Sequence, residues 1–188
     1  MLLQRLKRWF RGYNASELEL PIKPIHICYA QYISKHKYLM RLIGPSGFGG
    51  VLRHSNGKWI YGFAGTVGIS TILHVELLAI YHGLKVAWDQ GYRNIVCYSD
   101  STLSIQLIGR DVNSWHHYAS ILTNIRDLVK RNWSIDFKHT KREANAVADL
   151  LAKAGAAGTN AWTEFREPPP AAIPLLQADA ARVMFARI

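Results

Sequence analysis

Residues 133–153 read WSIDFKHTKREANAVADLLAK, and this stretch joins a predicted strand to a predicted helix. Apolar and polar residues alternate through its first seven positions and end at His139, which is the two-residue period of a half-buried strand. Apolar residues then recur at helical spacing through 144–154 and predict a helix with one buried face. Thr140 and Glu143 have the spacing of a capping box and predict where this helix starts.

The same stretch carries polar side chains that could form a site. Asn145 and Asp149 lie four residues apart, so both fall on one edge of the predicted helix. With His139 at the end of the strand, a histidine and a carboxylate come together where the strand passes into the helix. The alternative is a surface helix whose polar groups are all solvated, and spacing alone does not decide between the two.

A second carboxylate lies on the buried face of an earlier helix. Ser70 or Thr71 is a suitable cap for a helix that runs to about Gln90 and ends at Gly91. Glu76 falls on the apolar face of this helix, where a carboxylate is costly unless it is paired or binds a metal. The alternative is a first-turn glutamate whose carboxylate reaches water.

A third carboxylate, Asp100, follows the apolar segment 93–99, RNIVCYS. Continuous apolar character predicts a central strand of a parallel pair, buried on both faces. Ligands of open α/β sheets gather beyond the carboxyl ends of such strands, so Asp100 is a candidate site residue. The alternative is that Asp100 only caps the helix that begins at Ser101.

The remaining pattern is a set of strands and one further helix. Ser55-Asn56-Gly57 predicts a hairpin turn between two strands, since Asn-Gly favours tight β-turns. Residues 115–130 predict a helix with an apolar inner face. The segments 26–34, HICYAQYIS, and 37–44, KYLMRLIG, have the β-branched and aromatic content of strands.

Composition limits the class of protein. The chain has 188 residues, 49% of them hydrophobic, which suits one domain with one core, and we expect a monomer. No apolar run approaches the roughly 20 residues of a membrane-spanning helix, so no membrane association is expected. Cys28 and Cys97 have no metal-site spacing, which favours a reducing intracellular setting, nuclear or cytoplasmic. No segment is a clear targeting address.

The formal net charge of +10 favours a polyanionic partner, most often nucleic acid. The charge is concentrated near the amino terminus, because residues 1–47 carry eight Lys and Arg but only two acids. The first twelve residues, MLLQRLKRWFRG, are basic and amphipathic. They are compatible with a nucleic-acid-binding arm, a targeting presequence or a frayed helix.

Taken in order, these segments resemble a known family. GFGGVLRHSNGKWIYGFAGTVG (47–68), HVELLAIYHGLKVAWDQGYRNIVCYSDS (74–101), HTKREANAVADLLAKAG (139–155) and the Pro-rich ending EPPPAAIPLLQADAARVMFAR (167–187) are similar to the ribonuclease H type 1 fold, specifically the plant retroelement-type RNase H-like domains. The resemblance implies an α/β fold with a five-stranded mixed sheet flanked by helices. We expect a divergent basic segment over 1–46, in which the first strand of the domain is not located, the RNase H-like domain over 47–155 and a Pro-rich tail over 156–188.

The resemblance also implies an activity, the metal-dependent cleavage of RNA in RNA–DNA hybrids. Such domains hold two Mg²⁺ ions with four carboxylates, and the ions activate water and stabilise the leaving oxygen. Here the implied metal ligands are Glu76, Asp100 and Asp149. His139 matches a mobile histidine thought to help proton transfer or product release. The implied nucleic-acid contacts are Ser101, Arg142 and Asn145.

One expected ligand is missing. The family's first strand carries an Asp that bridges both metal ions, whereas this chain has no Asp before Asp89. The stretch expected to hold the motif is SKHKYLMRLIGPSG, with Lys35, Lys37 and Arg41 where negative charge is needed. Cations there would repel Mg²⁺.

Three functions therefore stay open. The chain is an RNA–DNA hybrid ribonuclease with an altered site, a catalytically inactive retroelement-derived module that binds nucleic acid, or an RNase H-like protein-interaction module. A further alternative is that residues 1–46 come from a wrongly joined reading frame and that the gene encodes the missing Asp just upstream of Gly47.

Overall fold

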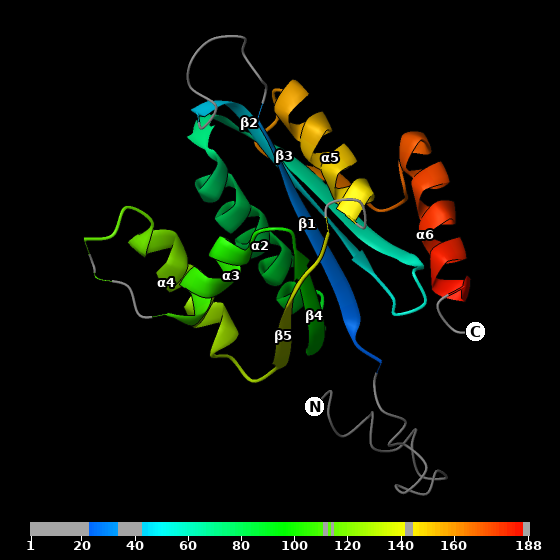
Figure 1. Cartoon of the computed structure of the whole chain (residues 1–188), viewed down its shortest axis with the longest axis horizontal. Helices are drawn as coiled ribbons and strands as arrows, with labels where there is room; N and C mark the ends of the chain where they lie inside the picture. Colours follow the sequence, from blue (N-terminus) through cyan, green and yellow to red (C-terminus); the bar gives the residue numbers. More distant parts are fainter. Residues whose placement is uncertain (1–22, 34–42, 111–112, 114, 142–144, 186–188) are drawn as a thin grey trace, which may run out of the picture.

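A six-stranded mixed sheet with helices on both faces forms the core of the chain (Figure 1). The computed structural model describes residues 23–33, 43–110, 113, 115–141 and 145–185. The strands lie in the order β5-β4-β1-β2-β3-β6. The elements are β1 (Ile25–Ile33), β2 (Ile43–Arg53), β3 (Trp59–Thr71), α2 (Ile72–Asp89), β4 (Asn94–Ser99), α3 (Thr102–Gly109), α4 (Ala119–Val129), β5 (Ser134–His139), α5 (Ala146–Ala157), β6 (Thr163–Phe165), the short 3-10 helix η2 (Pro170–Ala172) and α6 (Ile173–Phe185).

The sixth strand corrects the expected count of five. After α5 the chain returns to the free edge of β3, where β6 pairs antiparallel with Gly62–Ala64. Three residues are too few to show a strand period, which is why the sequence pattern did not reveal β6. The sheet thus includes residues on both sides of the range 47–155 expected for the domain.

Strand β1 occupies the middle of the sheet and confirms the strand predicted at 26–34, whereas the stretch expected to hold the first-strand motif, 34–47, follows it. It pairs antiparallel with β2, with His26 opposite Arg53, and parallel with β4, with Ile27 opposite Cys97. The family's first strand is therefore matched by residues 25–33, inside the segment 1–46 that was expected to be divergent. The stretch with Lys35, Lys37 and Arg41 follows that strand and lies outside the described residues.

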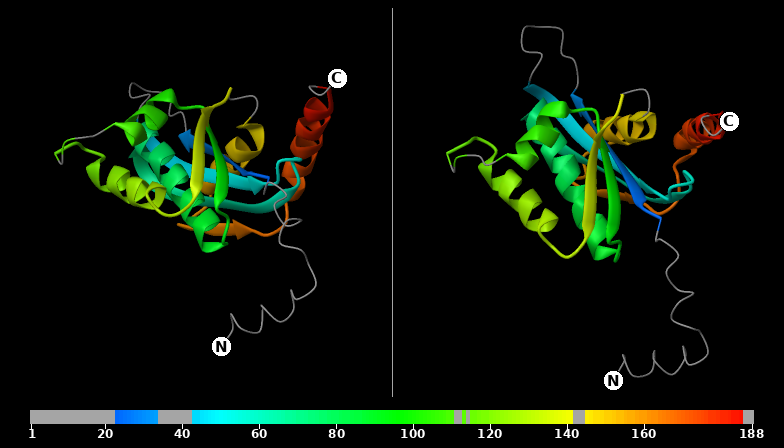
Figure 2. Two further views of the ribbon diagram at one scale, coloured as in Figure 1. Left: turned by 90° about the horizontal axis from the view of Figure 1, so that it is seen from below. Right: turned by 60° about the horizontal axis from the view of Figure 1, so that its bottom comes forward.

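The two faces of the sheet carry separate apolar clusters. Helices α2, α3 and α4 cover one face, and α5 and α6 cover the other (Figure 2). Consecutive β1 side chains alternate between the clusters: Ile27 and Tyr29 pack toward α2, whereas Cys28 and Ala30 pack toward α5. This alternation is what the two-residue period of a strand requires. None of the described helices is long and apolar enough to cross a membrane.

Several local predictions are confirmed. The β2–β3 hairpin turns at Asn56-Gly57, with Gly57 at φ 86°, a value that favours glycine. Helix α2 begins after Thr71, whose hydroxyl accepts the His74 N–H at 3.3 Å, and it is followed by Gly91 at φ 85°. Strand β4 lies between two parallel neighbours, β5 and β1, as its apolar character predicts.

The predicted starts of two helices are wrong. Helix α5 begins at Ala146 with Asn145 at its N-cap, so Thr140 does not cap it, and Glu143 lies outside the described residues. Helix α4 begins at Ala119 rather than Trp115. In the second case Tyr118 is the N-cap of α4, and its hydroxyl bonds the Thr71 Oγ1 at 2.8 Å.

Helix α5 lies directly on the backbone of the sheet. A Cβ added at Gly49 would lie 2.4 Å from the Ala152 nitrogen, and one at Gly155 would lie 2.6 Å from the Gly65 oxygen. Real Cβ atoms do not approach other atoms this closely, so only glycine fits at these contacts. The close contacts fix the middle and the carboxyl-terminal half of α5 against the sheet.

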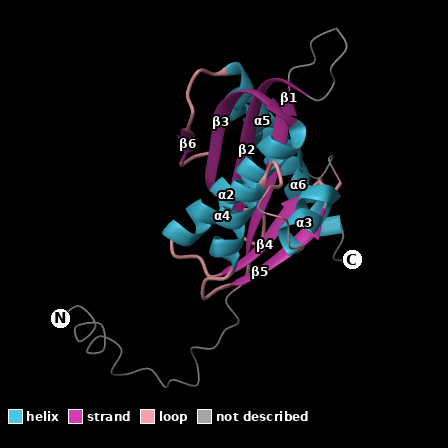
Figure 3. Ribbon diagram, turned by 90° about the vertical axis from the view of Figure 1, so that its left-hand side faces the viewer, coloured by secondary structure: helices cyan, strands magenta, loops and turns pink. Residues whose placement is uncertain are grey.

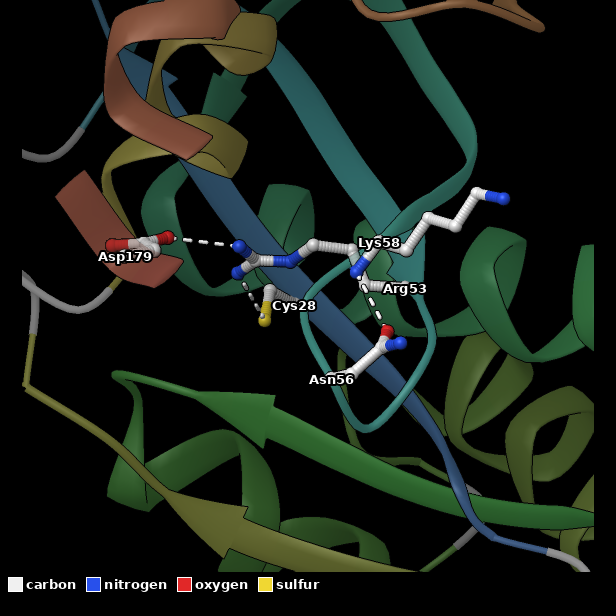
Figure 4. Close-up of polar contacts among 5 residues, drawn as sticks. All are labelled: Cys28, Arg53, Asn56, Lys58 and Asp179. Atoms are coloured by element: carbon white, nitrogen blue, oxygen red, sulfur yellow. Dashed lines mark hydrogen bonds and ion pairs between the residues drawn. The ribbon is translucent and has the colours of Figure 1, made fainter. Parts of the chain in front are cut away.

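Helix α6 is joined to the sheet by a largely buried ion pair (Figure 4). Arg53 on β2 donates from Nη1 to Asp179 Oδ2 at 2.8 Å and from Nη2 to the Cys28 sulfur at 3.4 Å. The Arg53 side chain is 10% exposed and that of Asp179 20%. The Pro-rich ending is therefore bonded to the domain rather than separate from it.

Candidate functional site

Glu76 and Asp100 come together in a narrow pocket near the carboxyl ends of β1 and β4. Helix α2 contributes Glu76 from its first turns, and Asp100 directly follows β4. The remaining pocket residues are Tyr29, Ala30, Ala79 and Ser99. The prediction that Asp100 stands at the end of a central parallel strand is confirmed.

The carboxylate of Glu76 is half-buried and bonded to serine hydroxyls. Ser104 Oγ donates to Glu76 Oε2 at 2.7 Å, and Ser101 and Ser104 bond each other at 2.9 Å. Burial raises the pKa of Glu76 above its ordinary value, and the neighbouring charge of Asp100 raises it further. The serine hydrogen bonds act in the opposite direction but are weaker than the burial. The alternative in which Glu76 is a first-turn glutamate with a solvated carboxylate therefore does not describe this structure.

Ala30 lies on β1 alongside Asp100. Cys28 pairs with Tyr98 in the parallel register of β1 and β4, so Ala30, two residues further on, is level with Asp100. It lines the same pocket as Glu76 and is 6% exposed. Its methyl group offers no oxygen to a metal ion. Among the residues of β1, Ala30 is the one that the register sets level with Asp100.

Asp149 and Asn145 are held at the amino end of α5. The carboxylate of Asp149 bonds Lys153 Nζ at 2.6 Å, one helical turn away. Asn145 is 1% exposed, and its amide donates to the Tyr29 carbonyl of β1. Its Oδ1 is buried and has no hydrogen-bond partner among the described residues. Asn145, expected to lie near a bound nucleic acid, thus bonds the end of α5 to β1.

Two other predicted site residues, His139 and Ser101, lie at the same end of the sheet. His139 ends β5, is exposed, and pairs with Ser99 in the parallel register, one residue before Asp100. Ser101 is the N-cap of α3, and its hydroxyl accepts the Ser104 N–H at 3.2 Å. Arg142 lies outside the described residues.

Sequence reasoning missed Ser104, which bonds Glu76, and Ala30, which lines the pocket. The i, i+3 spacing of Ser101 and Ser104 at a helix start could have revealed Ser104, because that spacing is typical of N-caps. Ala30 gave no signal of its own. Its importance follows from the parallel register of β1 and β4, which no local pattern reports.

Comparison with known proteins identifies the family. Residues 40–155 match a family model described as reverse transcriptase-like. The chain belongs to this family. Strand β1, with Ala30, precedes the matched residues. A protein of Arabidopsis thaliana named "Putative ribonuclease H protein" is 27% identical to this reverse transcriptase-like chain over 136 residues, which cover 72% of this chain and 22% of that protein. The chain thus spans about a fifth of the length of that relative.

Solved structures with the same fold are ribonucleases H. The N-terminal RNase H domain of a Mycobacterium tuberculosis protein is 20% identical with a TM-score of 0.62, covering 72% of this chain and 94% of that one. RNase H1 of the archaeon Halobacterium salinarum is 24% identical with a TM-score of 0.60, covering 71% and 98%. LC11-RNase H1 in complex with an RNA/DNA hybrid is 20% identical with a TM-score of 0.60, covering 71% and 96%. The reverse transcriptase-like chain therefore has the RNase H-like fold, as the sequence predicted.

The donors in this pocket do not fit the two-Mg²⁺ set that the resemblance implies. Two carboxylates, Glu76 and Asp100, line the pocket, where four ligands are needed, and Ala30 stands where another would be. Within the described residues, no three His, Cys, Asp or Glu side chains form a group that could hold a metal ion. Hard divalent cations need several oxygen ligands, which these residues do not provide together.

Proposed function

We propose that this chain is a nucleic-acid-binding module that keeps the RNase H-like fold and does not cleave RNA–DNA hybrids. The observation that carries the proposal is Ala30, which places a methyl group beside Glu76 and Asp100. Phosphodiester hydrolysis in this fold depends on metal ions that neutralise the charge of the transition state. A pocket that lacks the central oxygen donor has no means of holding two such ions.

Two further features of the site agree with a loss of catalysis. The Ser104 hydroxyl donates to Glu76 Oε2 at 2.7 Å, so a metal ion would compete with this hydrogen bond for that oxygen. Asp149 is bonded to Lys153 Nζ at 2.6 Å, so a metal ion would compete with an ammonium group for its oxygens.

Charge and fold support nucleic acid as the partner. The formal net charge is +10, and basic domains associate with phosphate backbones through a sequence-independent electrostatic attraction. LC11-RNase H1 and the foamy viral protease-reverse transcriptase, which share this fold, have been solved with RNA/DNA hybrids. We therefore take RNA–DNA hybrid as the first ligand to test.

The test measures binding and cleavage on the same labelled RNA–DNA hybrid, in Mg²⁺ and in Mn²⁺. We expect the hybrid to bind, with an affinity that falls steeply between 50 and 200 mM salt, about 10³-fold or more if six or more phosphates are contacted. We expect the RNA strand to stay intact. Asp100→Asn and Asp149→Asn should leave both results unchanged.

Two outcomes would overturn the proposal. Metal-dependent cutting that both variants lose would identify the chain as an RNA–DNA hybrid ribonuclease with a substitute for the first-strand ligand. If hybrid, single-stranded RNA and duplex DNA all fail to bind at 50 mM salt, nucleic acid is not the partner, and a protein-interaction module becomes the better description.

A further inference from the structure

Two turns lie next to each other at the end of the sheet opposite the carboxylates. One connects α2 to β4, and the other connects α4 to β5. The Ser134 N–H donates to the Arg93 carbonyl at 2.8 Å, and the β4–β5 pairing then begins with Asn94 opposite Ser134. Figure 3 shows β4 and β5 side by side at the border of the sheet, so both turns lie at its margin.

Two guanidinium groups converge on one indole ring at these turns. The Cζ of Arg93 lies 3.8 Å from the centroid of the Trp88 ring, and that of Arg131 lies 4.9 Å from it. The Trp133 ring meets the Trp88 ring edge-on, with the centroids 5.2 Å apart. We call Trp88, Arg93, Arg131 and Trp133 the paired-arginine surface. Its two positive charges are no more than about 9 Å apart, which is close to the Debye length of roughly 8 Å at physiological salt.

The charges of this surface have no acidic partner in the part of the chain that the structure describes. Neither Arg93 nor Arg131 forms an ion pair there, although both side chains are exposed. Arg93 is fixed by bonds from Nη1 to the carbonyls of Trp88 and Tyr92, each at 2.9 Å. Those bonds leave its Nε and Nη2 for a ligand. The indole ring of Trp133, two residues after Arg131, is also held in place, because its Nε1 donates to the Leu128 carbonyl at 2.8 Å.

Cation–π contact alone explains part of this arrangement. An exposed pair of this kind contributes about 0.5–1 kcal/mol, and one arginine suffices to cover one face of the Trp88 indole. A second guanidinium adds repulsion between like charges, with no acid to offset it. A bound anion near both side chains would offset that repulsion and accept hydrogen bonds from their N–H donors.

We propose that the paired-arginine surface binds phosphate groups of a nucleic-acid backbone. The proposal rests on the proposed function, since it gives nucleic acid a contact that the carboxylate pocket does not offer. Arginine donors match the oxygens of a phosphate in a fixed fork geometry, and the exposed Lys130 precedes Arg131 in the same turn. The length of β4 separates Arg93 from Asp100 by about 20 Å, so the two sites would contact different nucleotides.

The experiment compares two double variants with the same loss of charge. Arg93→Gln/Arg131→Gln removes both guanidiniums of the surface. Lys58→Gln/Arg166→Gln removes two exposed cations elsewhere and serves as the matched control. Binding of the labelled RNA–DNA hybrid is measured by fluorescence anisotropy between 50 and 200 mM KCl, and circular dichroism melting checks that both proteins fold.

We expect the surface variant to bind at least tenfold more weakly than the control. The slope of log K against log salt should fall by about 0.9 for each phosphate that the protein no longer neutralises. The single variants Arg93→Lys and Arg131→Lys keep the charge but lose the fork of donors, so their binding should lie between those of wild type and double variant.

The outcomes separate the two proposals. Equal binding by the surface and control variants would overturn this inference while leaving the proposed function standing. No binding by the unaltered protein would instead remove the proposed function. If polyglutamate displaces the labelled hybrid as effectively as unlabelled nucleic acid does, the surface binds an acidic protein partner. That result would also overturn the inference.

Discussion

A methyl group at position 30 changes the electrostatics of the pocket around Glu76 and Asp100. Two carboxylates there already repel each other, because the charge of Asp100 contributes to the raised pKa of Glu76. A third carboxylate on β1 would add to this repulsion and would require a cation to neutralise it. With alanine in place that added repulsion is absent, so we expect the side chain at position 30 to decide whether the site binds metal.

Ala30→Asp tests this dependence. We expect the variant to lose about 2–3 kcal/mol of unfolding free energy in EDTA, because a nearly buried carboxylate is then unpaired. We expect Mn²⁺ to restore part of that loss. The measurement is the melting temperature with EDTA and with Mn²⁺, for wild type, Ala30→Asp and the uncharged control Ala30→Asn.

Only the aspartate variant should respond to the metal. Equal responses of Ala30→Asp and Ala30→Asn would mean that Glu76 and Asp100 do not combine with position 30 as a set of ligands.

Glu76 itself should make the stability of the fold depend on pH. Its pKa is raised in the folded protein above the ordinary 4.5, so the folded state holds this proton more tightly than the unfolded chain does. The unfolding free energy should therefore fall as pH rises from about 4.5 through the raised pKa. Glu76→Gln removes this loss and should be more stable than wild type at pH 7.5, by on the order of 1 kcal/mol.

Urea unfolding at pH 5 and pH 7.5 measures this effect. The wild type should lose more stability between the two values than Glu76→Gln does. Parallel behaviour of the two proteins would show that Glu76 is ionised equally easily in the folded and unfolded states.

At the scale of elements, the contact between α5 and the sheet leaves no room for a side chain. A Cβ at Gly49 would lie 2.4 Å from the Ala152 nitrogen and 2.6 Å from the Leu151 carbonyl carbon, both backbone atoms. Gly49→Ala should therefore cost about 3 kcal/mol, since the helix must move away from β2. Chemical denaturation measures the cost.

Gly109→Ala is the matched control for this substitution. A Cβ at Gly109, the last residue of α3, would meet no atom within 4 Å. We expect this variant to be as stable as wild type or up to about 1 kcal/mol more stable, because alanine restricts the unfolded chain. Similar losses at both glycines would contradict the close contact at α5.

The attachment of α6 depends on the pair formed by Arg53 and Asp179. Asp179→Asn should cost about 2 kcal/mol, because the guanidinium of Arg53 is largely buried and loses its charged partner. Asp89→Asn breaks the exposed Lys85–Asp89 pair instead and should cost less than about 0.5 kcal/mol. Urea unfolding compares the two, and equal costs would mean that Arg53 is solvated without Asp179.

At the scale of the whole molecule, local signals predicted most elements of the fold. The turn at Asn56-Gly57, both limits of α2 and the strand before Asp100 all depend on neighbouring residues, and the structure confirms them. The resemblance to the ribonuclease H type 1 fold rests on the order of these segments along the chain, and it predicted the fold class. It also singled out Glu76 and Asp100, which the structure places in one pocket.

What the sequence did not reveal depends on contacts between distant segments. Strand β6 exists because β3 leaves a free edge, and its three residues have no pattern of their own. The sequence favours residues 34–47 as the stretch that holds the first-strand motif. Pairing with β2 and β4 instead places the first strand at 25–33. Ala30 is an ordinary small residue until the register sets it beside Asp100.

The bond between Arg53 and Asp179 also affects how the protein folds during synthesis. The two residues are 126 positions apart in the chain. At about 5–20 residues per second, a ribosome needs about 6–25 s to proceed from one to the other. During that time β1, β2 and β3 can pair, but the guanidinium at the end of β2 must remain solvated. The growing sheet therefore keeps one corner open to water, and to chaperones, until α6 has been made.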